Sequence, residues 1–266
     1  MNNNNFILKT LTTALLILAH FVSGAGAMDV ETIIQKANNA AYYAGDDGRA
    51  EIKMEITDSQ NRTRIRKFVI LRKDEKDGGN QMFYVYFQRP SDVRKMSFMV
   101  HKNTKKDDDR WLYLPALDLV KRIAASDKRT SFVGSHFYYE DVSGRSLNDD
   151  AHTLIETTDK HYVVNNTPKD PGSVEFSSFK VWIDKKTFLP VKAVYLDKQQ
   201  KAYREVEALE TKEIGGYPTV TKSRVKDLLS GGETVSEFTN VSYNIGLKTN
   251  LFSERYLRKP PKQIRK

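Results

Sequence analysis

A chain of 266 residues without a single cysteine excludes disulfide bonds, thiol nucleophiles and cysteine metal ligands. Lysine and arginine exceed aspartate and glutamate by nine. In an exported protein this surplus indicates acidic phospholipid headgroups or acidic protein surfaces as partners, and we expect no nucleic acid. No Gly/Ser-rich or Pro-rich stretch divides the chain, so we expect one domain.

The first 27 residues have the pattern of a signal peptide. Lys9 precedes an apolar run at residues 10–22 that is too short to remain as a permanent membrane anchor. Ala25, Gly26 and Ala27 then form an A-x-A cleavage site, and no cysteine follows it that a lipid could modify. We therefore expect cleavage after Ala27 and a mature protein in the periplasm.

A helix and a clear strand follow. Asp29 can cap a helix whose apolar residues recur every three or four positions up to Ala41, and glycines at 45–48 end it. Residues 50–56 alternate apolar and charged side chains, which predicts a strand with one dry and one wet face.

The rest of the chain is dominated by strand patterns separated by turns. The stretch at residues 82–87 is apolar on both faces, so both faces should be covered. Short helices are expected at 137–142 and 253–257. Further strands are predicted at residues 62–71, 82–87, 95–101, 111–114, 152–157, 162–165, 179–184, 191–196, 203–210, 220–228 and 235–243.

Short loops between so many strands predict an antiparallel meander, and an open sheet of this width tends to curl. One long helix is little material to fill the hollow of such a sheet. A cavity is therefore one expected outcome, although an ordinary packed β-sandwich would show the same alternation.

Residues 110–146 join apolar and cationic side chains. Residues 111–114 predict a buried strand that ends at Pro115, and a loop with four cations follows, before an aromatic stretch around Phe137. This composition suits an apolar pocket with a charged mouth. It equally suits a core strand followed by a solvated loop.

The order of motifs "WLYLPAL", "KRI", "KRTSF.G" and "F.YED" in this stretch resembles the signature of the outer-membrane lipoprotein-sorting protein family, the LolA-like carriers. The similarity continues through "FQRPSDVRKMSFMV" at 87–100 and "VWIDKKTFLPVKA" at 181–193, and is greatest to the branch often encoded beside large export permeases. The resemblance implies a mainly β fold over residues 28–257. A single curved antiparallel sheet would form an incomplete β-barrel, with the N-terminal helix and short helices over its concave face.

The resemblance also implies a carrier with an acyl-chain cavity that makes or breaks no bond, and an inner-membrane export permease as its partner. The surplus of basic residues adds an anionic membrane surface as a second expected partner. The basic tail at residues 258–266 is expected to be flexible and could touch either partner. The candidates for the cavity mouth or docking surface are Lys121, Arg122, Lys128 and Arg129. The candidates for the cavity lining are Ile52, Met54, Ile56, Phe83, Phe98, Trp111, Tyr113, Phe132 and Phe137.

Two other classes of function stay open. Ser135, His136 and Asp141 raise the possibility of a lipid hydrolase, but the chain contains no G-x-S-x-G motif, and in the family Ser135 is expected to cap a short helix. The other alternative is a non-transporting envelope adaptor or folding factor, whose hollow is filled by its own side chains. The histidines lack a metal-ligand spacing, so neither a metal nor a cofactor is expected.

Overall fold

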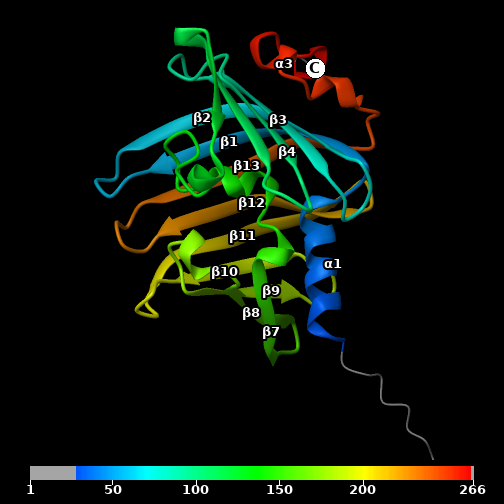
Figure 1. The fold of residues 1–266 in the computed structure, drawn as a ribbon, viewed down its shortest axis with the longest axis vertical. Helices are drawn as coiled ribbons and strands as arrows, with labels where there is room; N and C mark the ends of the chain where they lie inside the picture. Colours follow the sequence, from blue (N-terminus) through cyan, green and yellow to red (C-terminus); the bar gives the residue numbers. More distant parts are fainter. Residues whose placement is uncertain (1–27, 265–266) are drawn as a thin grey trace, which may run out of the picture.

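One curved antiparallel sheet is the framework of the described chain (Figure 1). The structure, a computed structural model, describes residues 28–264, so the predicted signal peptide lies outside the described residues. Thirteen strands follow one another in the order β6-β5-β4-β3-β2-β1-β13-β12-β11-β10-β9-β8-β7. Strands β6 and β7 are the two edges and do not pair with each other, so the barrel is incomplete. The predicted fold class is confirmed.

The strands are β1 (Asp47–Thr57), β2 (Thr63–Asp74), β3 (Gln81–Arg89), β4 (Ser97–Lys102), β5 (Asp109–Leu114), β6 (Leu119–Ile123), β7 (Asp150–Thr157), β8 (His161–Pro168), β9 (Ser178–Asp184), β10 (Pro190–Leu196), β11 (Ala202–Ile214), β12 (Tyr217–Asp227) and β13 (Glu233–Tyr243). The helices are α1 (Val30–Tyr42), α2 (Tyr139–Ser143) and α3 (Arg255–Arg258). Single 3-10 turns occur at Pro115–Leu117, Ala125–Asp127, Leu147–Asp149, Pro171–Ser173, Thr249–Leu251 and Lys262–Ile264. None of the helices described here combines the length and hydropathy needed to cross a membrane.

Strand β6 was missed by the sequence interpretation, which placed Lys121 and Arg122 on a loop. Both residues lie on this edge strand, which pairs with β5 through Leu112 and Trp111. The strand is short and mostly exposed, so it lacks the apolar alternation that identified the others. Cationic side chains on an edge strand oppose pairing with further chains.

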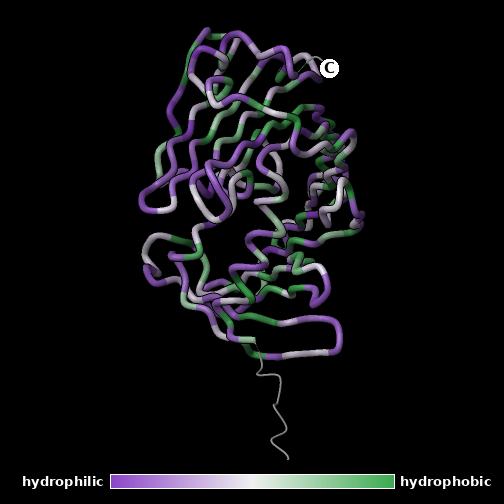
Figure 2. The backbone as a smooth tube through the Cα atoms, turned by 90° about the vertical axis from the view of Figure 1, so that its right-hand side faces the viewer, coloured by the Kyte–Doolittle hydropathy of each residue, from purple (hydrophilic) through white to green (hydrophobic). Residues whose placement is uncertain are grey.

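The sheet buries both of its faces near one end. On the concave face Phe68, Phe83 and Phe98 belong to one apolar cluster. Their neighbours along the strands face the convex side. Figure 2 shows that hydrophilic stretches gather at the outer turns. The convex cluster unites residues of β2, β3 and β4 with the C-terminal segment, residues 244–264, so the prediction that 82–87 is covered on both faces is confirmed. Its buried members are Val69, Leu71, Tyr84, Met99, Leu247, Leu251, Phe252, Leu257 and Ile264.

The C-terminal tail corrects another expectation. We expected residues 258–266 to lack fixed structure, but the part that is described, 258–264, packs on the convex face. Ile264 is buried, and the carbonyl of Gln263 accepts a hydrogen bond from Nε of Arg49 at 3.1 Å. The apolar side chain of Ile264 joins the convex cluster, an outcome that the basic composition of the tail conceals.

Two segments lie over the concave face. Helix α1 is capped as predicted by Asp29, whose side chain accepts a hydrogen bond from the backbone N–H of Thr32. The helix buries Ile33, Ile34 and Ala37. The connection between the two edge strands, residues 124–149, crosses the same face and carries α2; we call it the strap (Figure 1). The strap touches α1 at Gly144, where an added Cβ would lie only 2.5 Å from Cζ of Tyr42.

Candidate functional site

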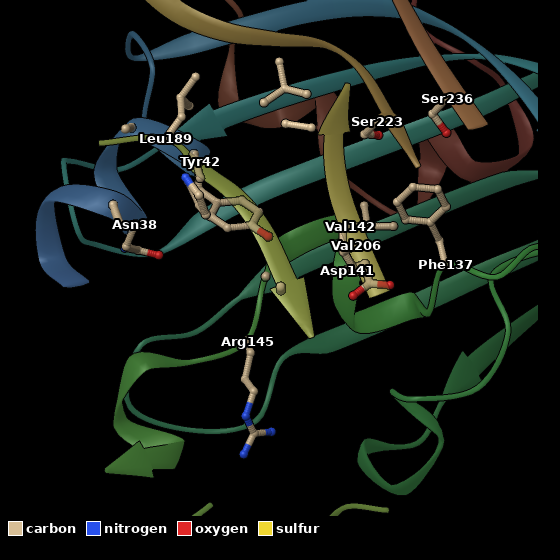
Figure 3. A pocket seen from close by; sticks show the side chains of 18 of the residues that line it. Asn38, Tyr42, Phe137, Asp141, Val142, Arg145, Leu189, Val206, Ser223 and Ser236 are labelled. Carbon is tan, nitrogen blue, oxygen red and sulfur yellow. The ribbon is translucent and has the colours of Figure 1, made fainter. Parts of the chain in front are cut away.

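A cavity of about 530 Å³ lies between the concave face of the sheet, helix α1 and the strap. This volume falls within the range of about 300–1,000 Å³ that is usual for small-molecule sites. The floor comes from strands on both sides of β1, and α1 and the strap form the cover. Figure 3 shows Phe137, Asp141 and Val142 of the strap on one side, with Ser223 and Ser236 of the sheet across from them. Apolar lining side chains include Ile34, Ala37, Ile52, Met54, Phe68, Ile70, Phe83, Val85, Phe132, Phe137, Val181, Ile183, Val206 and Phe238.

The structure brings together five of the nine predicted lining residues: Ile52, Met54, Phe83, Phe132 and Phe137. They lie on β1, β3 and the strap, far apart in sequence. Ile56 and Phe98 are buried in the same apolar cluster but do not line the cavity. Whether lipid contacts any of these side chains stays a prediction.

Trp111 and Tyr113 do not line the cavity. Their neighbour Leu112 points to the concave cluster, and because side chains alternate along a strand, Trp111 and Tyr113 point to the convex one. There the ring of Trp111 contacts His101 and lies 5.9 Å from the guanidinium of Arg122. The apolar sequence of β5 gave no sign of which alternate faces inward.

The four predicted mouth cations separate into two kinds. Lys121 and Arg122 are exposed, and Arg122 forms a surface ion pair with Asp109. Arg129 is not a mouth residue, because its side chain is only 7% exposed. Lys128 also turns inward, 3.5 Å from Glu140 and 3.6 Å from Asp149. Carboxylates inside the strap draw these two cations away from solvent.

Arg129 anchors the strap to the sheet. Its Nη1 donates to Glu140 of α2 at 2.6 Å, and its Nε and Nη2 donate to the two carboxylate oxygens of Glu175 at 2.8 and 2.7 Å. The guanidinium also lies 4.7 Å from the ring centre of Phe176 and 5.4 Å from that of Tyr195. Burial alone would raise the pKa of Glu140, but Arg129 and the neighbouring cations outweigh it and hold the pKa below its usual value.

Sequence reasoning missed two further arginines that fix the strap. Arg204 of β11 donates through Nη2 to Asp141, and its guanidinium lies 4.4 Å from the ring centre of Tyr138. Arg145 donates to both carboxylate oxygens of Asp150, from Nε at 2.8 Å and from Nη2 at 3.0 Å. Several residues of β11 are charged, and the sequence does not show which of them point to the concave face. Arg204 therefore could not be identified as an inward-facing residue from the sequence.

Lys102 holds the end of α2. Its Nζ donates to the carbonyl of Ser143 at 2.6 Å and lies 5.0 Å from the ring centre of Tyr42. Burial disfavours the charged ammonium group and lowers the pKa of Lys102 to about 8. This lysine therefore links the strap, α1 and the sheet at one point.

The residues that suggested a hydrolase do not form a triad. The hydroxyl of Ser135 is buried and donates to the carbonyl of Phe132 at 2.7 Å, so it closes a turn of the strap; helix α2 instead begins after Tyr138. Nδ1 of His136 lies 2.8 Å from the hydroxyl of Thr234. Asp141 accepts from the backbone N–H of Tyr138 and from Arg204, not from the histidine. Across residues 28–264, no three acidic or histidine side chains gather as a metal site would require.

Comparisons with known proteins agree with this architecture. A family model described as an uncharacterized protein matches residues 79–259. The structure of a DUF1329 family protein from Desulfovibrio piger is 29% identical in sequence, with a TM-score of 0.76 over 85% of this chain and 95% of that chain. Among curated proteins, no relative matches.

Two further solved structures are similar. A putative outer membrane lipoprotein-sorting protein domain from Vibrio parahaemolyticus is 25% identical, with a TM-score of 0.78 over 86% of this chain and 98% of that chain. A LolA superfamily protein from Nitrosomonas europaea is 19% identical, with a TM-score of 0.67 over 86% of this chain and all of the other. Fold and cavity together define a half-barrel protein, whose fold is similar to that of the LolA superfamily protein. The chain belongs to the DUF1329 family.

Proposed function

We propose that this protein is a periplasmic carrier that holds the acyl chains of a lipid or lipoprotein in its cavity and moves them toward the outer membrane. The observation that carries the proposal is the cavity itself, whose walls are mainly apolar and whose cover consists of helix α1 and the strap. The similarity to a putative outer membrane lipoprotein-sorting protein domain supports the direction of transport.

The energetics suit reversible binding. Burial of a methylene group contributes about 0.8 kcal/mol, so a chain of roughly sixteen carbons gains on the order of 12 kcal/mol when it leaves water. The same chain gains a similar amount in a membrane. Cavity and membrane therefore nearly balance, and a carrier of this kind can both load and unload.

The surplus of basic residues supports docking to anionic surfaces. Lys121 and Arg122 are exposed on edge strand β6, Arg122 in its surface pair with Asp109, and both side chains can approach anionic headgroups or an acidic export permease. Arg129 and Lys128 are excluded from this role by their carboxylate partners inside the strap.

The test is saturable binding of a fluorescent fatty-acid probe to the mature protein. The variant Ala208→Phe places a ring in the floor of the cavity and should abolish probe binding, because Ala208 lines the cavity. The matched control is Ala125→Phe on the exposed surface of the strap, which should bind like the wild type. Wild-type protein without saturable binding would leave the adaptor hypothesis standing.

A further inference from the structure

Two serine hydroxyls interrupt the apolar floor of the cavity. Ser223 of β12 and Ser236 of β13 are directly paired in the sheet register, so their side chains lie on the same face. Ser236 is also paired with Met54 of β1, and Ser223 with Ala208 of β11. All four residues line the cavity, and Figure 3 shows both serines on the wall across from Val142 and Phe137.

The hydroxyl of Ser236 has no hydrogen-bond partner within residues 28–264, although the residue is only 2% exposed. Two other buried hydroxyls on the same strands are satisfied: that of Thr219 lies 2.8 Å from the hydroxyl of Tyr243, and that of Thr234 lies 2.8 Å from Nδ1 of His136. The hydroxyl of Thr221 on β12 also lacks a partner among the described residues, but Thr221 does not line the cavity. A buried hydroxyl without a partner destabilises a protein, and alanine would fill the same position without that penalty. The fold alone therefore gives no reason for a serine here.

We propose that Ser223 and Ser236 form a polar subsite that donates hydrogen bonds to an acyl carbonyl of the cargo, the ester or amide group that joins a hydrocarbon chain to its headgroup. This inference rests on the proposed carrier function and names the part of the ligand that the cavity recognises through hydrogen bonds. A serine hydroxyl donates readily to a carbonyl oxygen. The apolar side chains of Met54, Val142 and Phe137 beside the subsite would hold the hydrocarbon chain that continues from the carbonyl.

The subsite is tested with pairs of ligands that differ only in the carbonyl. A diester phosphatidylglycerol and its diether analogue with the same chain length displace the fluorescent probe from the wild type and from the variant Ser223→Ala/Ser236→Ala. Because a hydrogen bond changes affinity by a few-fold and two act together, the wild type should prefer the diester by about tenfold. The double variant should bind both lipids with the affinity that the wild type has for the diether.

A second arm distinguishes the two sources of the carbonyl. An N-palmitoyl peptide is compared with an N-hexadecyl peptide, which lacks the amide carbonyl. Preference for the diester alone assigns the subsite to glycerol-linked chains, and preference for the palmitoyl peptide alone assigns it to amide-linked chains. Thermal melting of the ligand-free double variant should match or exceed that of the wild type, because an unpaired buried hydroxyl has been removed.

Three results would overturn the proposal. Equal affinity of the wild type for both members of each pair would show that the serines do not read a carbonyl, while leaving the carrier function intact. A lower melting temperature of the double variant, with discrimination retained, would show that the hydroxyls act in the fold. Failure of the wild type to bind any of the four ligands or the probe would overturn the carrier function and the subsite together.

Discussion

At the scale of single residues, the charged side chains of the strap decide how the cavity is covered. Arg129, Arg145 and Arg204 each carry a charge into a nearly buried position, and each meets a carboxylate there. A buried ion pair contributes little compared with an apolar replacement of both partners, but loss of one partner leaves an uncompensated charge. The sequence shows that arginines are abundant, but it does not show which of them are buried against carboxylates.

Replacement of Arg129 should therefore destabilise the fold. Arg129→Met leaves Glu175 without its bidentate partner and Glu140 with weaker compensation, so the free energy of unfolding should fall by about 3 kcal/mol. Urea denaturation measures this difference. The control is Arg122→Met, whose side chain is 68% exposed in its pair with Asp109 and whose loss should cost about 0–1 kcal/mol. Equal stability of the two variants would contradict the anchoring role of Arg129.

Lys102 should make stability depend on pH. Its pKa is about 8 in the folded protein against an ordinary value of 10.5, so between these values the unfolded chain binds more protons. Stability contributed by this group therefore rises with pH through this window. From pH 7.5 to 9.5 the wild type should gain about 2 kcal/mol relative to Lys102→Met, since one pKa unit corresponds to about 1.4 kcal/mol.

Urea denaturation at the two pH values measures this relative gain. Groups other than Lys102 titrate alike in both proteins, so the comparison isolates this lysine. Lys121→Met, an exposed lysine on β6, should run parallel to the wild type and serves as the control. Parallel profiles for Lys102→Met and the wild type would show that the ammonium group is not held in the buried position.

At the scale of elements, alternation predicted the long strands well and failed where burial departed from it. Strand β1 follows its period of two because one face is wet and the other lines the cavity. Strand β6 and the C-terminal segment escaped prediction for opposite reasons. The first is an exposed edge whose burial pattern is weak, and the second is a basic stretch whose few apolar residues complete the convex core. The local composition of a segment does not show which distant residues will pack against it.

The C-terminal segment should behave as part of the core. Leu257 is fully buried on the convex face, and its carbonyl accepts a hydrogen bond from the hydroxyl of Ser97 at 2.6 Å. Leu257→Ala should lower the free energy of unfolding by about 2–5 kcal/mol through lost burial and the cavity left behind. Leu229→Ala, at a side chain that is 64% exposed, should change it by less than about 0.5 kcal/mol. Equal free energies of unfolding for the two variants in chemical denaturation would contradict the packing of residues 244–264 in the core.

The contact between strap and helix can be tested with a pair of glycines. Gly144 has a φ of +76° and lies against Tyr42, whereas Gly134 has a φ of +78° and no heavy atom within 4 Å of a built Cβ. Gly134→Ala should cost about 1–2 kcal/mol for the left-handed backbone alone. Gly144→Ala adds the clash with Tyr42 to a backbone whose ψ of 153° is itself essentially restricted to glycine, so its melting temperature should be lower and its probe binding altered. Identical melting curves for the two variants would mean that α1 and the strap are not in close contact.

At the scale of the whole molecule, the sequence predicted a wide curved sheet but not what fills it. Alternating strands are equally compatible with a packed sandwich, and it was the resemblance of residues 110–146 to LolA-like proteins that favoured a half-barrel. Of the candidates for the lining, Ile52 and Phe83 lie on the cavity wall, whereas Trp111 and Tyr113 lie on the convex face. A shift of one residue exchanges the faces of a strand, and both alternates of β5 are apolar.

The central claim is that the cavity carries acyl chains, and mass spectrometry of the protein purified from its native host under non-denaturing conditions tests it most directly. We predict a complex with one acyl-bearing amphiphile per chain, which organic extraction releases. The Ala208→Phe variant should lack this ligand, and the Ala125→Phe variant should retain it. A wild-type protein of bare polypeptide mass, with no lipid in the extract and none acquired from phospholipid vesicles, would contradict it.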